Sequence, residues 1–273
     1  MNHDKNISHT QQQSLAIDID AKRLCYMIYN PCGNETATVG QIAINADSQH
    51  EWCKELENAV YDNPFLLEGF NTCTIAVHAR HFVLMPQEVA TAGLAQRVLE
   101  ESFSSVEGEV FTSPINGTDI AIACDVPQAV VPFLRRTFNS PTLLHHLSPL
   151  CHYCCSAYAE ENGCMHVMIE KDVAHLVATR RGKLLLANTM QYRSLDDLAY
   201  FALNAWQSCQ MNSMSDKILT SGDNELRQQL AQQLRQWIKY AMPQILPAAA
   251  LKLDRDAINL PFNLIALALY ENN

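Results

Sequence analysis

The sequence predicts an α/β protein made of two related halves, each with a mixed five-stranded sheet flanked by helices. Alternating apolar residues mark strands, apolar residues spaced i, i+3, i+4 mark helices, and the order three strands, helix, strand, helix occurs twice. Matching Asp18 with Glu170 and Thr74 with Ile218 gives an offset of roughly 150 residues, which suggests an ancient duplication. We expect a disordered tail over 1–13, a first lobe over 14–140 and a second lobe over 141–273.

The first half begins with three strands that connect without room for a helix. They are expected at 15–19, 24–29 and 36–44. Ser48 and Glu51 then form a capping box ahead of a helix whose apolar face carries Trp52. Further strands are expected at 74–77, 82–85, 110–111 and 120–124, and further helices from Pro86 to about Phe103 and from Asp125 to near Phe138.

The second half repeats this order after a short helix that begins near Ser148. Strands are expected at 165–169, 175–178, 184–190 and 217–220. Ser194 and Asp197 cap a helix with a continuous apolar stripe that includes Trp206, and Trp237 lies on the stripe of the next helix. All three tryptophans are therefore expected in the core.

Composition and charge exclude several classes of function. The chain is 48% hydrophobic and 18% charged, as in globular proteins, and its formal net charge of −10 opposes nucleic acid as a partner. The polar start does not read as a signal peptide, and no apolar run approaches the roughly 18 residues of a membrane helix. We expect a cytoplasmic protein without direct membrane insertion. Its nine glycines include no two within six positions, which excludes the dinucleotide fingerprint, the phosphate-binding loop and the nucleophile elbow.

The first hairpin of each half carries acidic residues, at Asp18 and Asp20 and at Glu170 and Asp172. Together with the repeated element order over 14–269, this organisation resembles the actin-like ATPase superfamily. More narrowly, the chain resembles a bacterial family of unknown function with that fold, distantly similar to the pilus-assembly relatives of actin. The resemblance implies two ribonuclease-H-like lobes around a nucleotide cleft.

In that superfamily each hairpin turn carries an acid, a spacer and a glycine, so that backbone amides reach the nucleotide phosphates. Here Asp20 and Asp172 stand where the glycines would be, and like charges about 4 Å apart cost several kcal/mol. A glycine pair that receives adenosine survives only in part, as Ser221 and Gly222, and a plain strand-to-helix turn is the favoured explanation of Gly222. The resemblance thus implies a vestigial nucleotide cleft.

Cysteines and histidines gather over 145–166, the one segment whose spacing could bind a metal. Cys151 and Cys154 have the spacing of a zinc ligand pair, but no second pair follows at a matching distance. The helical pattern places Cys154 on an apolar stripe, so we expect buried thiols and no metal. His78 and His81 flank a hairpin turn, where solvated imidazoles are expected.

These observations favour a non-catalytic actin-like protein that acts as a cytoplasmic scaffold through a protein partner or self-association, without a cofactor. One alternative is a nucleotide-binding ATPase or small-molecule kinase that binds ATP with magnesium through Asp18, Asp20, Glu170 or Asp172. A weaker alternative is a zinc or redox protein built on the segment from Cys151 to His166.

Overall fold

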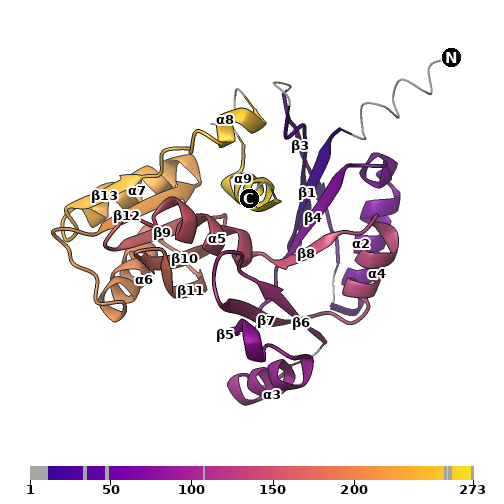
Figure 1. Cartoon of the computed structure of the whole chain (residues 1–273), viewed down its shortest axis with the longest axis horizontal. Coiled ribbons are helices and arrows are strands. Elements are labelled where there is room, and N and C mark those ends of the chain that lie inside the picture. Colours follow the sequence, from indigo (N-terminus) through magenta and orange to yellow (C-terminus); the bar gives the residue numbers. More distant parts are fainter. Residues whose placement is uncertain are drawn as a thin grey trace.

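The computed structural model describes residues 12–32, 36–46, 49–106, 108–254, 257 and 260–271. The molecule is an α/β protein with two five-stranded sheets of the same design, one in each lobe (Figure 1). The tail was expected over 1–13, and its residues 1–11 lie outside the described residues, as does the expected helix cap at Ser48.

The first sheet has the strand order β3-β2-β1-β4-β8. Its strands are β1 (Ser14–Ile19), β2 (Arg23–Tyr29), β3 (Thr38–Ala43), β4 (Thr72–Val77) and β8 (Thr142–His145). Strand β1 pairs antiparallel with β2 and parallel with β4. Strand alternation turns Leu15, Ile17 and Ile19 toward helices α2 (Gln49–Tyr61) and α4 (Val130–Thr137), where they share one core with Trp52.

The second sheet repeats this topology in the order β11-β10-β9-β12-β13. Its strands are β9 (Cys164–Ile169), β10 (Val173–Arg180), β11 (Lys183–Gln191), β12 (Lys217–Gly222) and β13 (Tyr240–Pro243). Helices α6 (Leu195–Ser208) and α7 (Asn224–Leu234) cover one face. Trp206, which belongs to α6, is buried in the core between these helices and the sheet. The capping box expected at Ser194 and Asp197 is present. Both leading hairpins are antiparallel, as expected.

The two halves correspond in a register that differs from the expected match by two residues. The amide of Asp20 donates to the carbonyl of Arg23, and the amide of Glu170 donates in the same way to Val173. Each of these acids is the first residue after its strand, so Glu170 corresponds to Asp20, and the match with Asp18 was wrong. Asp18 lies within β1 itself. Strand alternation alone cannot detect a shift of two, because it leaves every side chain on the same face.

Four features of the fold depart from the sequence expectations. The strands β5 (Phe82–Pro86), β6 (Glu109–Pro114) and β7 (Ile120–Val126) form a separate sheet with α3 (Ala92–Ser102), inserted only in the first half. Short 3-10 turns, Pro64–Leu67 and Gln87–Val89, precede β4 and α3. Strand β8 lies beyond residue 140 but pairs with β4. Trp237 is 50% exposed, because α7 ends at Leu234 before its stripe reaches this residue.

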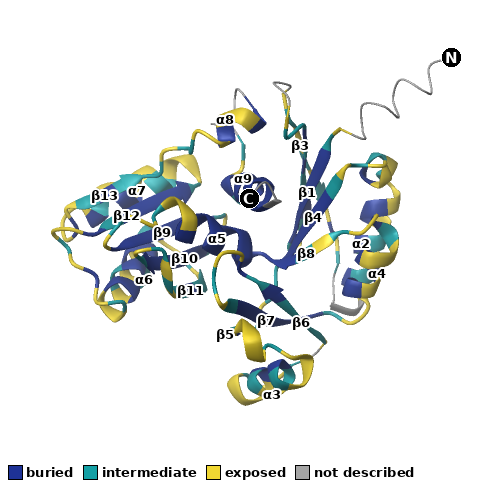
Figure 2. Cartoon of the chain, in the orientation of Figure 1, coloured by how far each residue is buried: buried dark blue, intermediate teal, exposed yellow. Residues whose placement is uncertain are grey.

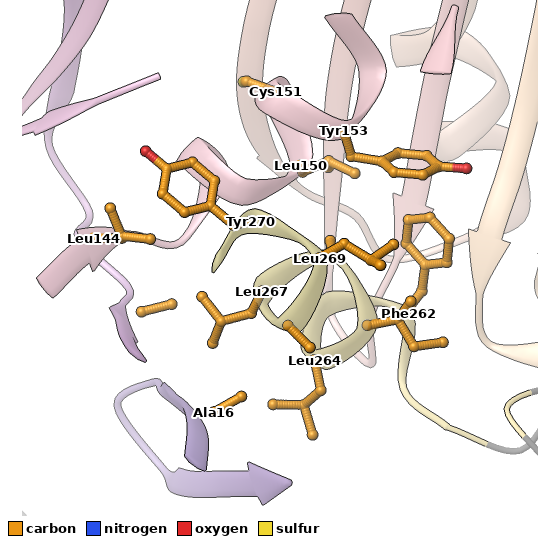
Figure 3. Packing of buried hydrophobic residues seen from close by; sticks show 14 of the residues in the cluster. Ala16, Leu144, Leu150, Cys151, Tyr153, Phe262, Leu264, Leu267, Leu269 and Tyr270 are labelled. Atoms are coloured by element: carbon orange, nitrogen blue, oxygen red, sulfur yellow. The ribbon is translucent and has the colours of Figure 1, made fainter. Parts of the chain in front are cut away.

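The inner faces of the two sheets are joined by two helices that lie between them. Helix α5 (Leu147–Ala157) and the last helix, α9 (Phe262–Glu271), pack against each other there, and the short helix α8 (Ala250–Leu253) precedes α9 (Figure 1). One buried cluster contains residues of β1, β8, α5, β9, β10 and α9 (Figures 2 and 3). The lobes therefore share a continuous apolar core.

Helix α9 is apolar on every side, which is typical of a helix buried all round. In Figure 3, Leu264 and Leu267 lie toward Ala16 and Leu144 of the first sheet, while Phe262 lies beside Tyr153 of α5. Among the described residues, no helix combines the length and the apolar character needed to cross a bilayer.

Candidate functional site

The candidate site lies where the first hairpin turns of the two lobes meet at the ends of the inner faces. Because side chains alternate along β1, Asp18 shares the inner face with Ala16. Asp20 and Glu170 follow the ends of β1 and β9, one in each lobe. The fold therefore brings three of the expected acids to one place between the lobes.

The turn after β1 is closed by the carboxylate of Asp20. Its Oδ1 atom accepts hydrogen bonds from the backbone amides of Lys22 and Arg23, at 2.7 and 3.0 Å. Its Oδ2 atom accepts a bond of 2.7 Å from Nε of Arg23. The amides of this turn, which would otherwise be free to bind an anion, are thus already bound to a carboxylate of the same chain.

The guanidinium of Arg23 crosses from the first lobe to the second. While Nε binds Asp20, an Nη atom donates to Oε2 of Glu170 at 3.0 Å. The two side chains are 29% and 12% exposed, so this ion pair is largely shielded from water. A second contact between the lobes, from Lys22 to Asp172 at 3.5 Å, is open to solvent and contributes little.

Asp18 is buried and bound from two directions. Nε2 of His78 lies 3.1 Å from Oδ1 of Asp18, and the amide of Asn263, at the start of α9, donates to Oδ2 at 2.7 Å. Burial alone would lower the pKa of His78, but the charge and hydrogen bond of Asp18 outweigh it and raise the pKa to about 9. His78 is therefore a protonated, half-buried partner of Asp18, and the expected solvated imidazole was wrong.

Three further histidines gather beside this pair. The rings of His78 and His146 stack with centroids 4.1 Å apart, His145 lies 4.2 Å from His146, and His175 lies 5.0 Å from it. Burial, reinforced by the positive charge of His78, lowers the pKa of His145 and of His146 well below the usual range. Both of these rings are therefore neutral near pH 7.

A threonine hydroxyl orients two of the rings. Thr189 is the cross-strand neighbour of His175 in the β10–β11 pair. Its Oγ1 atom lies within hydrogen-bond distance of Nδ1 of His175, at 2.9 Å, and of Nε2 of His146, at 3.3 Å. One ring nitrogen of each histidine is thereby engaged, and the other is left facing the cluster.

Two overlapping groups in the described parts of the chain have the geometry to hold a metal ion. One comprises His78, His146 and His175, and the other comprises Asp18, His78 and Glu170. Within each group the donor atoms lie within 4.8 Å of one another. Sequence analysis identified the acids of the second group and placed His146 in the segment over 145–166 that could bind a metal. It did not bring His78, His146 and His175 together, because they come from distant positions with no spacing motif.

The expected adenosine element lies at the join between β12 and α7. The hydroxyl of Ser221 is within 2.7 Å of Nε2 of His166. Gly222 has φ +88°, and a Cβ atom there would lie 1.9 Å from the carbonyl oxygen of Ile169. Asp223 caps α7 by accepting hydrogen bonds from the amides of Glu225 and Leu226. This element thus has a structural role as a tight strand-to-helix turn.

The cysteine segment forms part of the core. Cys151, Cys154, Cys155 and Cys164 are buried free thiols, and burial raises the pKa of each. The nearby ring of His166 is fully buried, which lowers its pKa to about 3. A raised thiol pKa disfavours the thiolate that redox chemistry and zinc binding require. Among the described residues, the two metal-capable groups contain no cysteine.

Comparisons with known proteins agree with this architecture. Residues 2–241 match the model of the family described as "Protein of unknown function (DUF3822)". No curated protein matches the chain. A Bacteroides thetaiotaomicron VPI-5482 protein with an actin-like ATPase fold and unknown function superposes with a TM-score of 0.76 at 19% identity, covering 93% of this chain and 97% of that one. The PilM–PilN type IV pilus biogenesis complex contains a chain that matches with a TM-score of 0.59 at 13% identity, covering 96% and 98%. The chain therefore has the actin-like ATPase fold that the resemblance implied.

Proposed function

The chain belongs to the DUF3822 family, and we propose that it is a non-catalytic actin-like protein that acts as a cytoplasmic scaffold through a protein partner or self-association. The observation that carries this proposal is the network of Asp20, Arg23 and Glu170, which joins the hairpin turns of the two lobes. In the superfamily that the sequence resembles, these turns receive nucleotide phosphates.

Two backbone features suited to phosphate are each occupied by a carboxylate of the chain itself. Asp20 accepts from the amides of the first turn, and Asp223 accepts from the first amides of α7. A helix N-terminus and a tight turn are the usual anion sites of such folds. An incoming phosphate would have to displace these bonds and would also face the charges of Glu170 and Asp18, which supports weak nucleotide binding.

Binding to another protein is supported by the pilus neighbour of the same fold, which is seen in complex with its partner PilN. A fold that has lost its nucleotide can still present a rigid surface, because the two lobes share one core through α5 and α9. We therefore expect association without any requirement for ATP. Sedimentation velocity over a range of concentrations, with and without ATP and magnesium, measures self-association and its dependence on nucleotide.

The alternative, an ATPase or small-molecule kinase, is favoured by one observation: Asp18, His78 and Glu170 form a group that could hold a cation. Titration calorimetry with ATP and magnesium separates the two functions. We expect no binding stronger than about 1 mM, or about −4 kcal/mol. A dissociation constant in the low micromolar range, about −8 kcal/mol, that weakens in Asp18→Asn would establish the alternative and overturn the proposal.

A further inference from the structure

We propose that the histidine cluster between the lobes binds one divalent first-row transition metal ion, such as Zn²⁺, through His78, His146 and His175, with Glu170 as the fourth ligand. The donor atoms of the three histidines lie within 4.8 Å of one another. In a tetrahedral zinc site the donors lie about 3.3 Å apart, since each is about 2.0 Å from the metal. Binding would therefore require side-chain rotations that bring the donors up to about 1.5 Å closer, including in the stacked rings of His78 and His146.

Three atoms of the proposed ligands lack other partners, whereas Nε2 of His78 is already bound to Asp18. Nδ1 of His146, Nε2 of His175 and Oε1 of Glu170 are each buried without a hydrogen bond. Nε2 of His175 and Oε1 of Glu170 approach to 3.6 Å, which is longer than a hydrogen bond. Buried polar atoms without partners are costly, and several converging on one point indicate a missing ligand.

The surroundings supply the outer contacts that metal-bound histidines need. Thr189 binds the ring nitrogens of His146 and His175 that point away from the cluster. A hydrogen bond of this kind fixes the ring orientation and directs the other nitrogen toward the metal. His78 would have to release its proton when the metal binds, and 17% of its side chain is exposed to the solvent that would accept it.

The donor set selects the class of metal. Three imidazoles with one carboxylate suit zinc and its first-row neighbours, whereas magnesium and calcium prefer oxygen ligands. The ligands belong to both sheets, because His78 follows β4 while Glu170 and His175 belong to the β9–β10 hairpin. A bound ion would therefore link the lobes where other members of the superfamily hold nucleotide, and this inference does not depend on the proposed scaffold role.

Calorimetry of the full chain tests the site, after the affinity tag is removed and the protein is stripped with EDTA. We expect one equivalent of Zn²⁺ to bind with a dissociation constant below about 10 µM. Thr189→Val should weaken binding about 10- to 100-fold, and His78→Asn should weaken it at least about 100-fold. His81→Asn is the matched control, because His81 pairs with Asp125 in a similar way but outside the cluster.

Cobalt absorption gives a measurement that does not depend on how the variants fold. Co²⁺ bound to the wild-type chain should show ligand-field bands of a nitrogen and oxygen site, without thiolate charge-transfer absorption. The proposal is overturned if Zn²⁺ does not bind at 100 µM metal, about tenfold above the expected constant. Thiolate absorption would also overturn it, as would equal weakening in His78→Asn and His81→Asn.

Discussion

One arginine side chain connects the acidic turns of both lobes. Burial alone would raise the pKa of Glu170, but the nearby His175 ring, 3.6 Å away, and the positive charge of His78 outweigh burial and lower the pKa. Glu170 therefore stays ionised with only 12% of its side chain exposed. Such a charge requires a partner, and Arg23 provides it from the opposite lobe.

Removing that partner should destabilise the protein. We expect Arg23→Met to lower the free energy of unfolding by about 2 to 4 kcal/mol, less than for a fully buried pair because Arg23 is 29% exposed. Urea unfolding with EDTA present measures this effect without interference from metal. Lys22→Met is the control, because its contact with Asp172 is open to solvent. Equal effects of the two substitutions would show that the Arg23 contact does not hold the lobes together.

The join between β12 and α7 depends on a single glycine. Strand β12 pairs in parallel with β9, so Gly222 lies directly beside Ile169 and leaves no space for a side chain. Its positive φ places it in a region that residues other than glycine rarely adopt. The next residue, Asp223, then begins helix α7. The sequence indicated a turn at this glycine, but the close backbone approach depends on a strand about 50 residues earlier in the chain.

Gly222→Ala should therefore be strongly destabilising. The added methyl group would meet the Ile169 carbonyl at 1.9 Å, so we expect a loss of at least about 2 kcal/mol in the free energy of unfolding. Thermal and urea unfolding measure the loss. Gly93→Ala, in helix α3, is the matched control, because no atom lies within 4 Å of its added Cβ. This explanation of Gly222 is wrong if Gly222→Ala lowers the free energy of unfolding no more than Gly93→Ala does.

The whole molecule should unfold as one cooperative unit if the core between the lobes governs its stability. That core contains residues of both sheets, and Leu267 of α9 is 1% exposed within it. Trp52 and Trp206 lie in the separate outer cores of the two lobes and so report on each lobe independently. Trp237 is exposed and can be replaced by phenylalanine without disturbing either core.

We expect the two lobes to unfold together. In one variant Trp52 is the only tryptophan, and in the other Trp206 is the only one. The fluorescence of the two variants should show the same urea midpoint of unfolding. Leu267→Ala should shift both midpoints equally, with a loss of about 2 to 5 kcal/mol, because it leaves a cavity in the shared core. Separate midpoints, or a shift seen by one tryptophan alone, would show that the lobes are independent.

The amino-acid sequence by itself determined most of the elements and their order. Alternation identified the leading hairpins, helical spacing with Ser194 and Asp197 identified α6, and the repeat predicted two sheets of one design. It also placed acids at the turns and Cys154 on a buried stripe. These features depend on neighbouring residues or on period, so local physical rules are enough to recognise them.

Only the tertiary structure decided what those elements build together. It placed α9 between the lobes, added β8 to the first sheet and left Trp237 exposed. It also showed that Asp20, and not Asp18, corresponds to Glu170. It brought His78, His146 and His175 close together. The physical reason is that these contacts join residues far apart in the chain. The local pattern shows that a face is apolar, but it does not show which other face packs against it.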